Sequence, residues 1–187
     1  ARRLSRAGAE LFGNIYNKPL PFPFDGFSTA RGNAADTCQQ LTSELLAGSL
    51  DFNALIAMPA KVKNRGVTVL RDSWRAFTQT GVVSRRPGHA IPRGVTERWD
   101  KALNEEGRLA LTPALREICH PPYGANVASA ALLLGVYVAP RCSDLGIVIN
   151  GQQLSVSQWL QQGVFRGKFL DLAGVDGVEL VVVGEGS

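Results

Sequence analysis

The chain has 187 residues and a mass of 20.1 kDa, which leaves room for one ordinary domain or two very small ones that share a core. Hydrophobic residues make up 45% of the chain and charged residues 19%, so disorder is excluded for most of its length. The longest strongly apolar run, residues 127–139, is shorter than the roughly 20 residues that cross a bilayer, so we expect no transmembrane helix and no membrane partner.

The formal net charge of +4 is unevenly distributed along the chain. Residues 1–100 hold 14 Lys and Arg against 8 Asp and Glu, whereas residues 101–187 hold 6 against 8. This modest excess permits a polyanion partner and places any nucleic-acid contact in the N-terminal half. Three cysteines without a CxxC pair indicate reduced thiols in a cytoplasmic protein. No secretory leader follows Ala1; the alternatives are that a leader has been removed or that the chain is a segment of a longer protein.

The N-terminal residues predict a basic helix followed by a proline-interrupted segment. Leu4, Ala7 and Leu11 recur at helical spacing within residues 1–12. Residues 16–27 read YNKPLPFPFDGF, and alternating prolines exclude a helix there. We expect the apolar rings of this segment to dock on the domain surface; the alternative is that they bind a partner protein. These rings are Phe22, Phe24 and Phe27.

Helical periodicity and capping residues predict four helices between residues 33 and 106. They cover residues 33–47, 51–58, 64–77 and 96–106. The first would bury Leu41, Leu45 and Leu46, and the second would end at Pro59. The third would bury an apolar face made of Val67, Leu70, Trp74 and Phe77. The loop before the fourth helix reads VVSRRPGHAIPRG, a composition that predicts the most mobile part of the chain.

The C-terminal part has a different pattern. Thr112 is a candidate cap for a helix that ends before Pro121 and Pro122, and residues 125–139 then predict an almost wholly apolar helix. Asn150-Gly151 favours a type I′ hairpin turn, because both central residues need a positive φ. A helix follows near residues 155–162, and residues 178–183 predict a buried strand.

The order of short helix, tight turn, second helix and hairpin is that of a winged-helix domain. We therefore predict an α+β, mainly α-helical fold. Its helical N-terminal region would cover residues 1–107, and a winged-helix-like unit would cover residues 108–187.

Sequence motifs of catalysis are missing from the chain. The phosphate-binding motif GxxxxGK[ST] is absent, because Gly167-Lys168 is followed by Phe169, and neither HExxH nor GxSxG occurs. We predict no catalytic residue, no cofactor and no metal. The alternative is a small enzyme with an unrecognised site near Cys119 and His120, although adjacent helical residues diverge by about 100° and do not readily grip one metal ion.

Basic residues of the N-terminal half are the candidate nucleic-acid contacts. They are Lys61, Lys63, Arg65, Arg71, Arg75, Arg85, Arg86 and Arg93. Their alternative role is a solvated face opposite the apolar one. The helix over residues 125–139 offers base edges only Asn126 and Ser129, which argues against sequence-specific reading of DNA and favours a helix that packs against protein.

The run LTPALREICHPPYGANVASAALLLGVYVAPR, with the hairpin at residues 147–156 after it, resembles the helical and winged-helix region of large bacterial phage-defence ATPases of the BREX type. The similarity covers residues 109–183 and rests on fold-forming residues, above all the turn Pro121-Pro122-Tyr123-Gly124. It implies that ATP is hydrolysed in a separate domain, so no ATPase residue is carried over. The chain would then be a non-catalytic module whose partners are parent ATPase domains, sister subunits or non-specifically bound DNA. The other alternative is a stand-alone protein-binding regulator.

Overall fold

The computed structural model describes residues 15–22, 33–166, 169–170 and 175–184. The helix predicted over residues 1–12 and the rings of Phe24 and Phe27 lie outside them. The described residues form an α+β, mainly helical structure, which confirms the predicted class. The helices are α2 (Asn33–Leu46), α3 (Phe52–Ile56), α4 (Ala60–Gly66), the π-helix η1 (Val67–Ser73), α5 (Ala90–Glu106), α6 (Leu111–Cys119), α7 (Val127–Val138), the short 3-10 helix η2 (Ala139–Arg141) and α8 (Val156–Gln161).

Within the described residues, six strands form two antiparallel sheets. They are β1 (Arg108–Ala110), β2 (Leu145–Ile149), β3 (Gln152–Ser155), β4 (Phe165–Arg166), β5 (Phe169–Leu170) and β6 (Val178–Val182). The larger sheet has the order β1-β6-β2-β3, and β4 pairs with β5. The register places one apolar row straight across the larger sheet, made of Leu109, Leu180, Ile147 and Leu154. Because side chains alternate between faces, this row fixes which face of the sheet is turned to the core.

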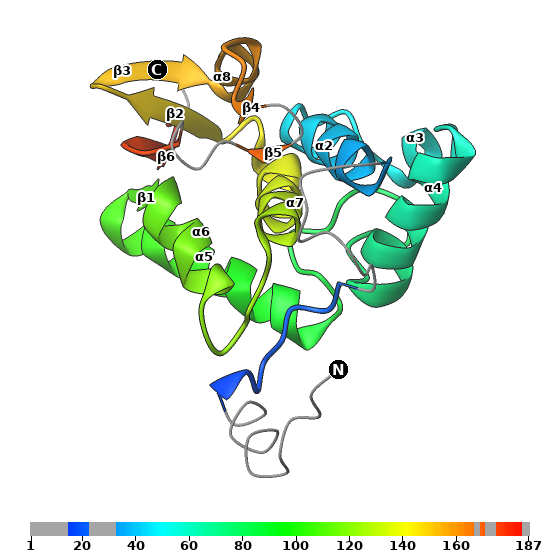
Figure 1. The fold of residues 1–187 in the computed structure, drawn as a ribbon. Helices are drawn as coiled ribbons and strands as arrows, with labels where there is room; N and C mark the ends of the chain where they lie inside the picture. Colours follow the sequence, from blue (N-terminus) through cyan, green and yellow to red (C-terminus); the bar gives the residue numbers. More distant parts are fainter. Residues whose placement is uncertain (1–14, 23–32, 167–168, 171–174, 185–187) are drawn as a thin grey trace.

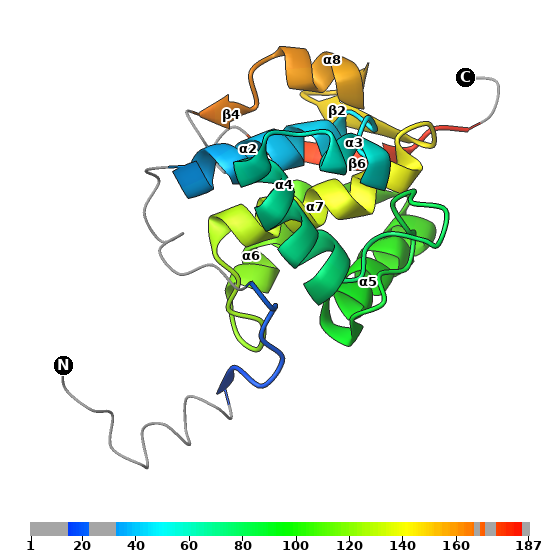
Figure 2. The same cartoon turned by 90° about the vertical axis from the view of Figure 1, so that its right-hand side faces the viewer.

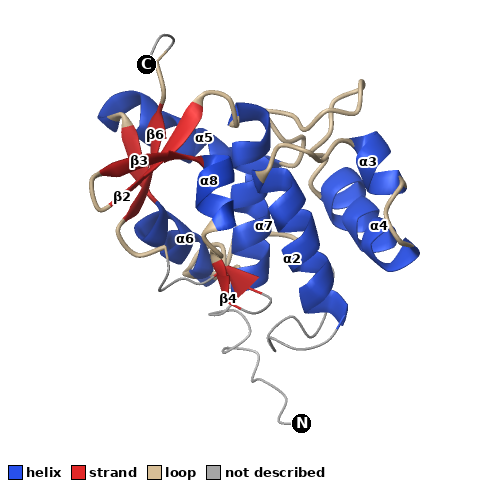
Figure 3. Ribbon diagram, turned by 90° about the horizontal axis from the view of Figure 1, so that it is seen from above, coloured by secondary structure: helices blue, strands red, loops and turns tan. Residues whose placement is uncertain are grey.

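Helix α7 is the centre of the molecule. Figures 1 and 3 show it between the larger sheet and the α3–α4 corner, with α2 alongside. Every residue from Ala128 to Val138 is buried, as the apolar run predicts. At Gly135 an added Cβ would lie 2.9 Å from Cβ of Leu45, so the glycine lets α2 and α7 approach closely.

Local signals in the C-terminal part are confirmed. Asn150 and Gly151 have φ values of 51° and 77°, the positive pair that a type I′ turn between β2 and β3 requires. Ser155 caps α8 with a complete capping box to Gln158. Asn126 was not predicted as a cap, but it caps α7 by accepting the backbone N–H of Ser129, so the helix begins at Val127 rather than at residue 125.

The third predicted helix differs from its expected form. It begins at Ala60 rather than Asn64, directly after Pro59, whose φ of −53° suits a helix entry. From Val67 to Ser73 it is a π-helix, and the N–H of Trp74 bonds the carbonyl of Val69 at 2.8 Å. The wider i→i+5 spacing ends the 3.6-residue periodicity, so the predicted apolar face does not continue to Phe77.

Helix α5 begins six residues before its predicted start. His89 caps it, and Pro92 is accommodated in the first turn, where backbone N–H groups have no intrahelical partner. The loop predicted to be mobile is therefore shorter, and backbone hydrogen bonds join Ser84 to Ala76 and Gly88 to Arg75.

Two further differences concern the start of the C-terminal part. Helix α6 begins at Leu111 with Ala110 as its cap, so Thr112 is not the cap. The buried Oγ1 of Thr112 has no hydrogen-bond partner within the described residues. Strand β1 was not predicted, because three residues after the left-handed Gly107 are too few for an alternating pattern to be visible.

One cluster of buried hydrophobic residues extends from Leu20 to Leu180 and includes residues on both sides of position 107. The division into two regions at that position stays a prediction. Among the helices of the described residues, none combines the length and the apolar character that crossing a bilayer requires.

Candidate functional site

The basic residues predicted to contact phosphates lie on several segments. Lys61, Lys63 and Arg65 are on α4, and Arg71 is on η1. Arg75 follows η1, Arg85 and Arg86 lie in the loop before α5, and Arg93 is in the first turn of α5.

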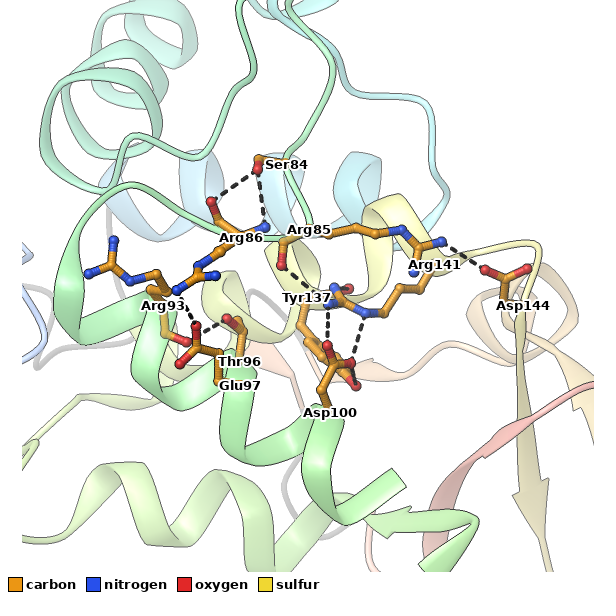
Figure 4. Close-up of polar contacts among 10 residues, drawn as sticks. All are labelled: Ser84, Arg85, Arg86, Arg93, Thr96, Glu97, Asp100, Tyr137, Arg141 and Asp144. Atoms are coloured by element: carbon orange, nitrogen blue, oxygen red, sulfur yellow. Dashed lines mark hydrogen bonds and ion pairs between the residues drawn. The ribbon is translucent and has the colours of Figure 1, made fainter. Parts of the chain in front are cut away.

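Three of these side chains form ion pairs with acidic groups of the same chain. Nε of Arg71 lies 2.8 Å from Oδ1 of Asp72. Figure 4 shows the other two: Nη2 of Arg85 lies 2.8 Å from Oδ2 of Asp144, and Nη2 of Arg86 lies 3.2 Å from Oε1 of Glu97. All six side chains are at least half exposed, so solvent screens each pair. A phosphate would still have to compete with these carboxylates for the arginines.

The remaining basic residues differ in their surroundings. Arg65 donates to Oγ1 of Thr37 at 3.4 Å, and Arg93 donates to the carbonyl of Gly88 at 3.1 Å. No ion pair joins Lys61, Lys63 or Arg75 to another described residue. The described structure thus leaves three of the eight predicted contacts as cations without an acidic partner or a side-chain hydrogen bond.

A buried arginine that the sequence did not single out lies beside the paired arginines. The side chain of Arg141 is 5% exposed, and it binds Asp100 through two hydrogen bonds, Nε to Oδ1 at 3.1 Å and Nη2 to Oδ2 at 2.9 Å. It also donates to the backbone carbonyls of Tyr137 at 2.8 Å and Arg85 at 3.2 Å (Figure 4). These bonds tie α5, α7 and the loop before α5 together, because the guanidinium carries five donors in a fixed plane.

Tyr137 completes this polar cluster. Its hydroxyl donates to Oδ1 of Asp100 at 2.8 Å, and the guanidinium of Arg141 stacks 4.2 Å from the centre of its ring. Burial, and then the hydrogen bond to Asp100, raise the pKa of Tyr137 well above its usual range. A hollow of about 270 Å³ opens beside the cluster, and its two aspartates balance its two arginines. Because both oxygens of Asp100 accept hydrogen bonds from Arg141 or Tyr137, the cluster acts as a structural clamp between α5, α7 and η2.

The cysteine and histidine of the enzyme alternative do not form an activated pair. Cys119 is the last residue of α6 and is half-buried, and burial raises the pKa of its thiol. His120 is exposed and adopts extended backbone geometry with ψ of 168°. A thiol held in its protonated form is a poor nucleophile at neutral pH. Within the described ranges, no group of three or more His, Cys, Asp and Glu could hold a metal ion.

The described part of the aromatic-proline segment is docked, and of the three predicted rings Phe22 is the one within it. Residues 15–22, which we call the strap, lie against the turn that joins α6 to α7 (Figure 2). Leu20 is buried at 7% exposure, and Phe22 packs against the core. The indole Nε1 of the fully buried Trp74 donates to the carbonyl of Pro21 at 2.6 Å.

Sequence reasoning missed Arg141, Asp100 and the indole N–H of Trp74. A signal for Arg141 is its position directly after a fully apolar helix, where a charge has little access to water. For Trp74 the sequence indicates only that a buried indole needs an acceptor, because Pro21, which supplies the carbonyl, lies 53 positions away.

Comparison of the chain with models of known protein families, with curated proteins and with solved structures finds no match.

Proposed function

We propose that this chain is a non-catalytic interaction module that assembles with other protein domains. The observation that carries the proposal is the docking of the strap, which the rest of the domain holds through main-chain and indole hydrogen bonds. Protein–peptide interfaces use the same main-chain and side-chain hydrogen bonds, so these contacts are suited to binding an extended segment. The ion pairs of Arg71, Arg85 and Arg86 support protein over DNA as the main partner, because they neutralise part of the basic surface.

Non-specific DNA contact is the second candidate, and the cations without an acidic partner favour it. Three phosphate contacts, from Lys61, Lys63 and Arg75, would give a slope of about −3 in a plot of log affinity against log salt. We therefore expect fluorescence anisotropy of a labelled duplex to show weak binding with a slope no steeper than about −3. In the double variant Lys61→Gln/Lys63→Gln the slope should shrink by about 2. A slope of about −6 or steeper for the unmodified chain would make DNA the main partner.

We also propose that the module is part of a larger cytoplasmic phage-defence ATPase and that residues 108–187 form a winged-helix-like unit. The succession of α6, a tight turn, α7 and the β2–β3 hairpin supports this assignment. The burial of α7 from Ala128 to Val138 supports a scaffolding role, since buried residues present no side chains to bases.

The test of this assignment is assembly with the domains encoded in the same reading frame. We expect that frame to encode a phosphate-binding loop of the form GxxxxGK[ST], and we expect the domain carrying it to co-elute with this module when both are expressed together. Static light scattering gives the mass of the complex. A reading frame without such a loop, or two proteins that elute separately, would contradict the proposal.

A further inference from the structure

The strap is held in the way that a bound peptide is held. Its backbone N–H groups at Lys18 and Leu20 donate to the carbonyls of Pro122 and Tyr123 at 3.3 and 3.2 Å. On the other side, the indole of Trp74 donates to the carbonyl of Pro21 at 2.6 Å. Pro122, Tyr123 and Trp74 thus supply two acceptors and a donor to an irregular segment that forms no helix or strand between residues 16 and 22.

The rest of the domain also packs against side chains of the strap. Leu20 joins the main hydrophobic cluster, and Phe22 packs against that cluster from outside. The ring of Tyr16 lies over Gly124, where an added Cβ would come within 2.8 Å of it. Gly124 therefore leaves the space in which the tyrosine ring lies.

The position of Trp74 depends on two uncommon backbone features. The π-helix η1 leads directly into it, and Arg75 after it has a φ of 50°, a left-handed conformation that is rare for a large side chain. Gly88 packs against this residue so closely that an added Cβ would lie 2.8 Å from Cβ of Arg75. Such features cost free energy and cluster at binding sites, which is consistent with a tryptophan aimed at a ligand carbonyl.

We propose that the surface covered by the strap, formed by Trp74 and the turn at residues 121–124, is a binding site for a proline-rich extended segment of a partner protein. The strap occupies the same site within the chain. The inference rests on the proposed function and names the kind of partner. Prolines fix φ and bias the preceding residue towards extended geometry, so such a segment loses little entropy on binding. The occupant needs a leucine-sized residue followed by a proline whose carbonyl accepts the indole N–H.

Because the strap occupies the site, a partner segment can bind only when the strap leaves it. A tethered segment competes at a high effective concentration, so a partner segment binds weakly while the strap is in place. The apparent affinity for a partner equals the intrinsic affinity multiplied by the fraction of molecules in which the strap has left the site. Weakening the strap should therefore strengthen binding of an external peptide, whereas a strap with only a structural role would give no such effect.

The experiment uses the full chain and a fluorescently labelled peptide with the sequence of residues 15–22. In one variant, Leu20→Ser/Phe22→Ser, the strap loses its apolar anchors. We expect this variant to bind the peptide at least about tenfold more tightly than the unmodified chain in fluorescence anisotropy. Ile15→Ser, in the exposed part of the strap, is the matched control and should bind like the unmodified chain. Circular dichroism confirms folding, and the milder Phe22→Ala replaces the double variant if that one does not fold.

Two further measurements locate the binding. A peptide in which Leu20 is replaced by serine should not bind, and this comparison leaves the protein unchanged. Trp74→Phe, added to the strap variant, removes the indole donor and should weaken binding of the original peptide at least about tenfold, as expected for a lost buried hydrogen bond. A folded strap variant that fails to bind the peptide, or one whose binding is insensitive to Trp74→Phe, would overturn the proposal.

A second copy of the chain is the other possible source of the segment. If the unmodified chain is a dimer in light scattering and the peptide converts it to a monomer, the occupant is the strap of a second copy and the partner assigned here is wrong. Failure of the peptide to bind refutes only the proposed binding site at Trp74 and residues 121–124. It leaves the co-elution test of the proposed function unaffected, since that test measures assembly by any surface.

Discussion

Replacing Asp100 with asparagine removes the charge that balances the buried guanidinium of Arg141. The side chain of Arg141 is 5% exposed, so water cannot take over the lost interaction at the guanidinium itself. Removing one partner of a fully buried pair costs about 3–5 kcal/mol. The side chain of Asp100 is 44% exposed, and asparagine keeps one acceptor oxygen for Arg141 or Tyr137, so the cost here is smaller. We expect Asp100→Asn to lower the free energy of unfolding by about 2 kcal/mol.

Urea unfolding followed by circular dichroism measures this change. With an m value of about 2 kcal/mol per molar, the expected loss lowers the midpoint by about 1 M. Asp144→Asn is the matched control, because it changes the same chemical group in the ion pair with Arg85, whose side chains are 59% and 56% exposed. An exposed pair contributes less than about 0.5 kcal/mol after side-chain entropy and screening, so the midpoint of this control should move by less than about 0.25 M.

A double-mutant cycle separates the pair from its surroundings. Arg141→Met in the Asp100→Asn background removes the unpaired charge, and the coupling energy between the two positions should be about 1–3 kcal/mol. If Asp100→Asn unfolds at the same urea concentration as Asp144→Asn, burial of the guanidinium does not govern the strength of this clamp and the reasoning is refuted.

Three other predictions concern glycines and a buried thiol. Gly124→Ala should lower the free energy of unfolding by about 2 kcal/mol in thermal or urea unfolding, and Gly107→Ala by roughly 1 kcal/mol. Both glycines have a positive φ, but only at Gly124 would the added methyl group meet the strap, so equal losses would contradict this strap contact. Gly135→Ala should destabilise the fold by about 1–3 kcal/mol, because the added methyl group clashes with α2. Gly94→Ala has open space around it in α5 and should stabilise the fold by about 0.5–1 kcal/mol. Two changes of the same sign in urea unfolding would contradict this reasoning. Burial raises the pKa of the Cys38 thiol to about 12, with a nearby arginine opposing the shift, so between pH 9 and 12 only the unfolded chain releases this proton and stability falls as pH rises. Cys38→Ala should make the loss of stability from pH 8 to 10 shallower, and an unchanged slope would show that this thiol is not responsible.

The local part of the fold could be predicted from the sequence. The helix over residues 33–46, the apolar helix α7 and the Asn150-Gly151 turn depend on periodicity or on the conformational preferences of adjacent residues. The capping box at Ser155 is equally local, since its two hydrogen bonds join residues three apart. Signals of this kind are complete within a few positions, so they survive in a single sequence.

The π-helix and strand β1 required tertiary context. The spacing of Val67, Leu70 and Trp74 is compatible with an ordinary helix, and only the surrounding core decides that the backbone widens there. Strand β1 exists because β6, about seventy residues later in the chain, supplies its hydrogen-bond partners. A three-residue segment carries no periodic signal of its own.

The candidate sites also combine residue types that the sequence shows with contacts between residues far apart in the chain. The sequence by itself determined which side chains were available: a cluster of arginines, a proline-aromatic segment and a fully apolar helix. Only the tertiary structure decided their partners, because the bond from Trp74 to Pro21 spans 53 positions, that from Arg141 to Asp100 spans 41, and that from Arg85 to Asp144 spans 59. Pairings across such separations depend on how helices pack around α7, and no pattern of neighbouring residues encodes that packing.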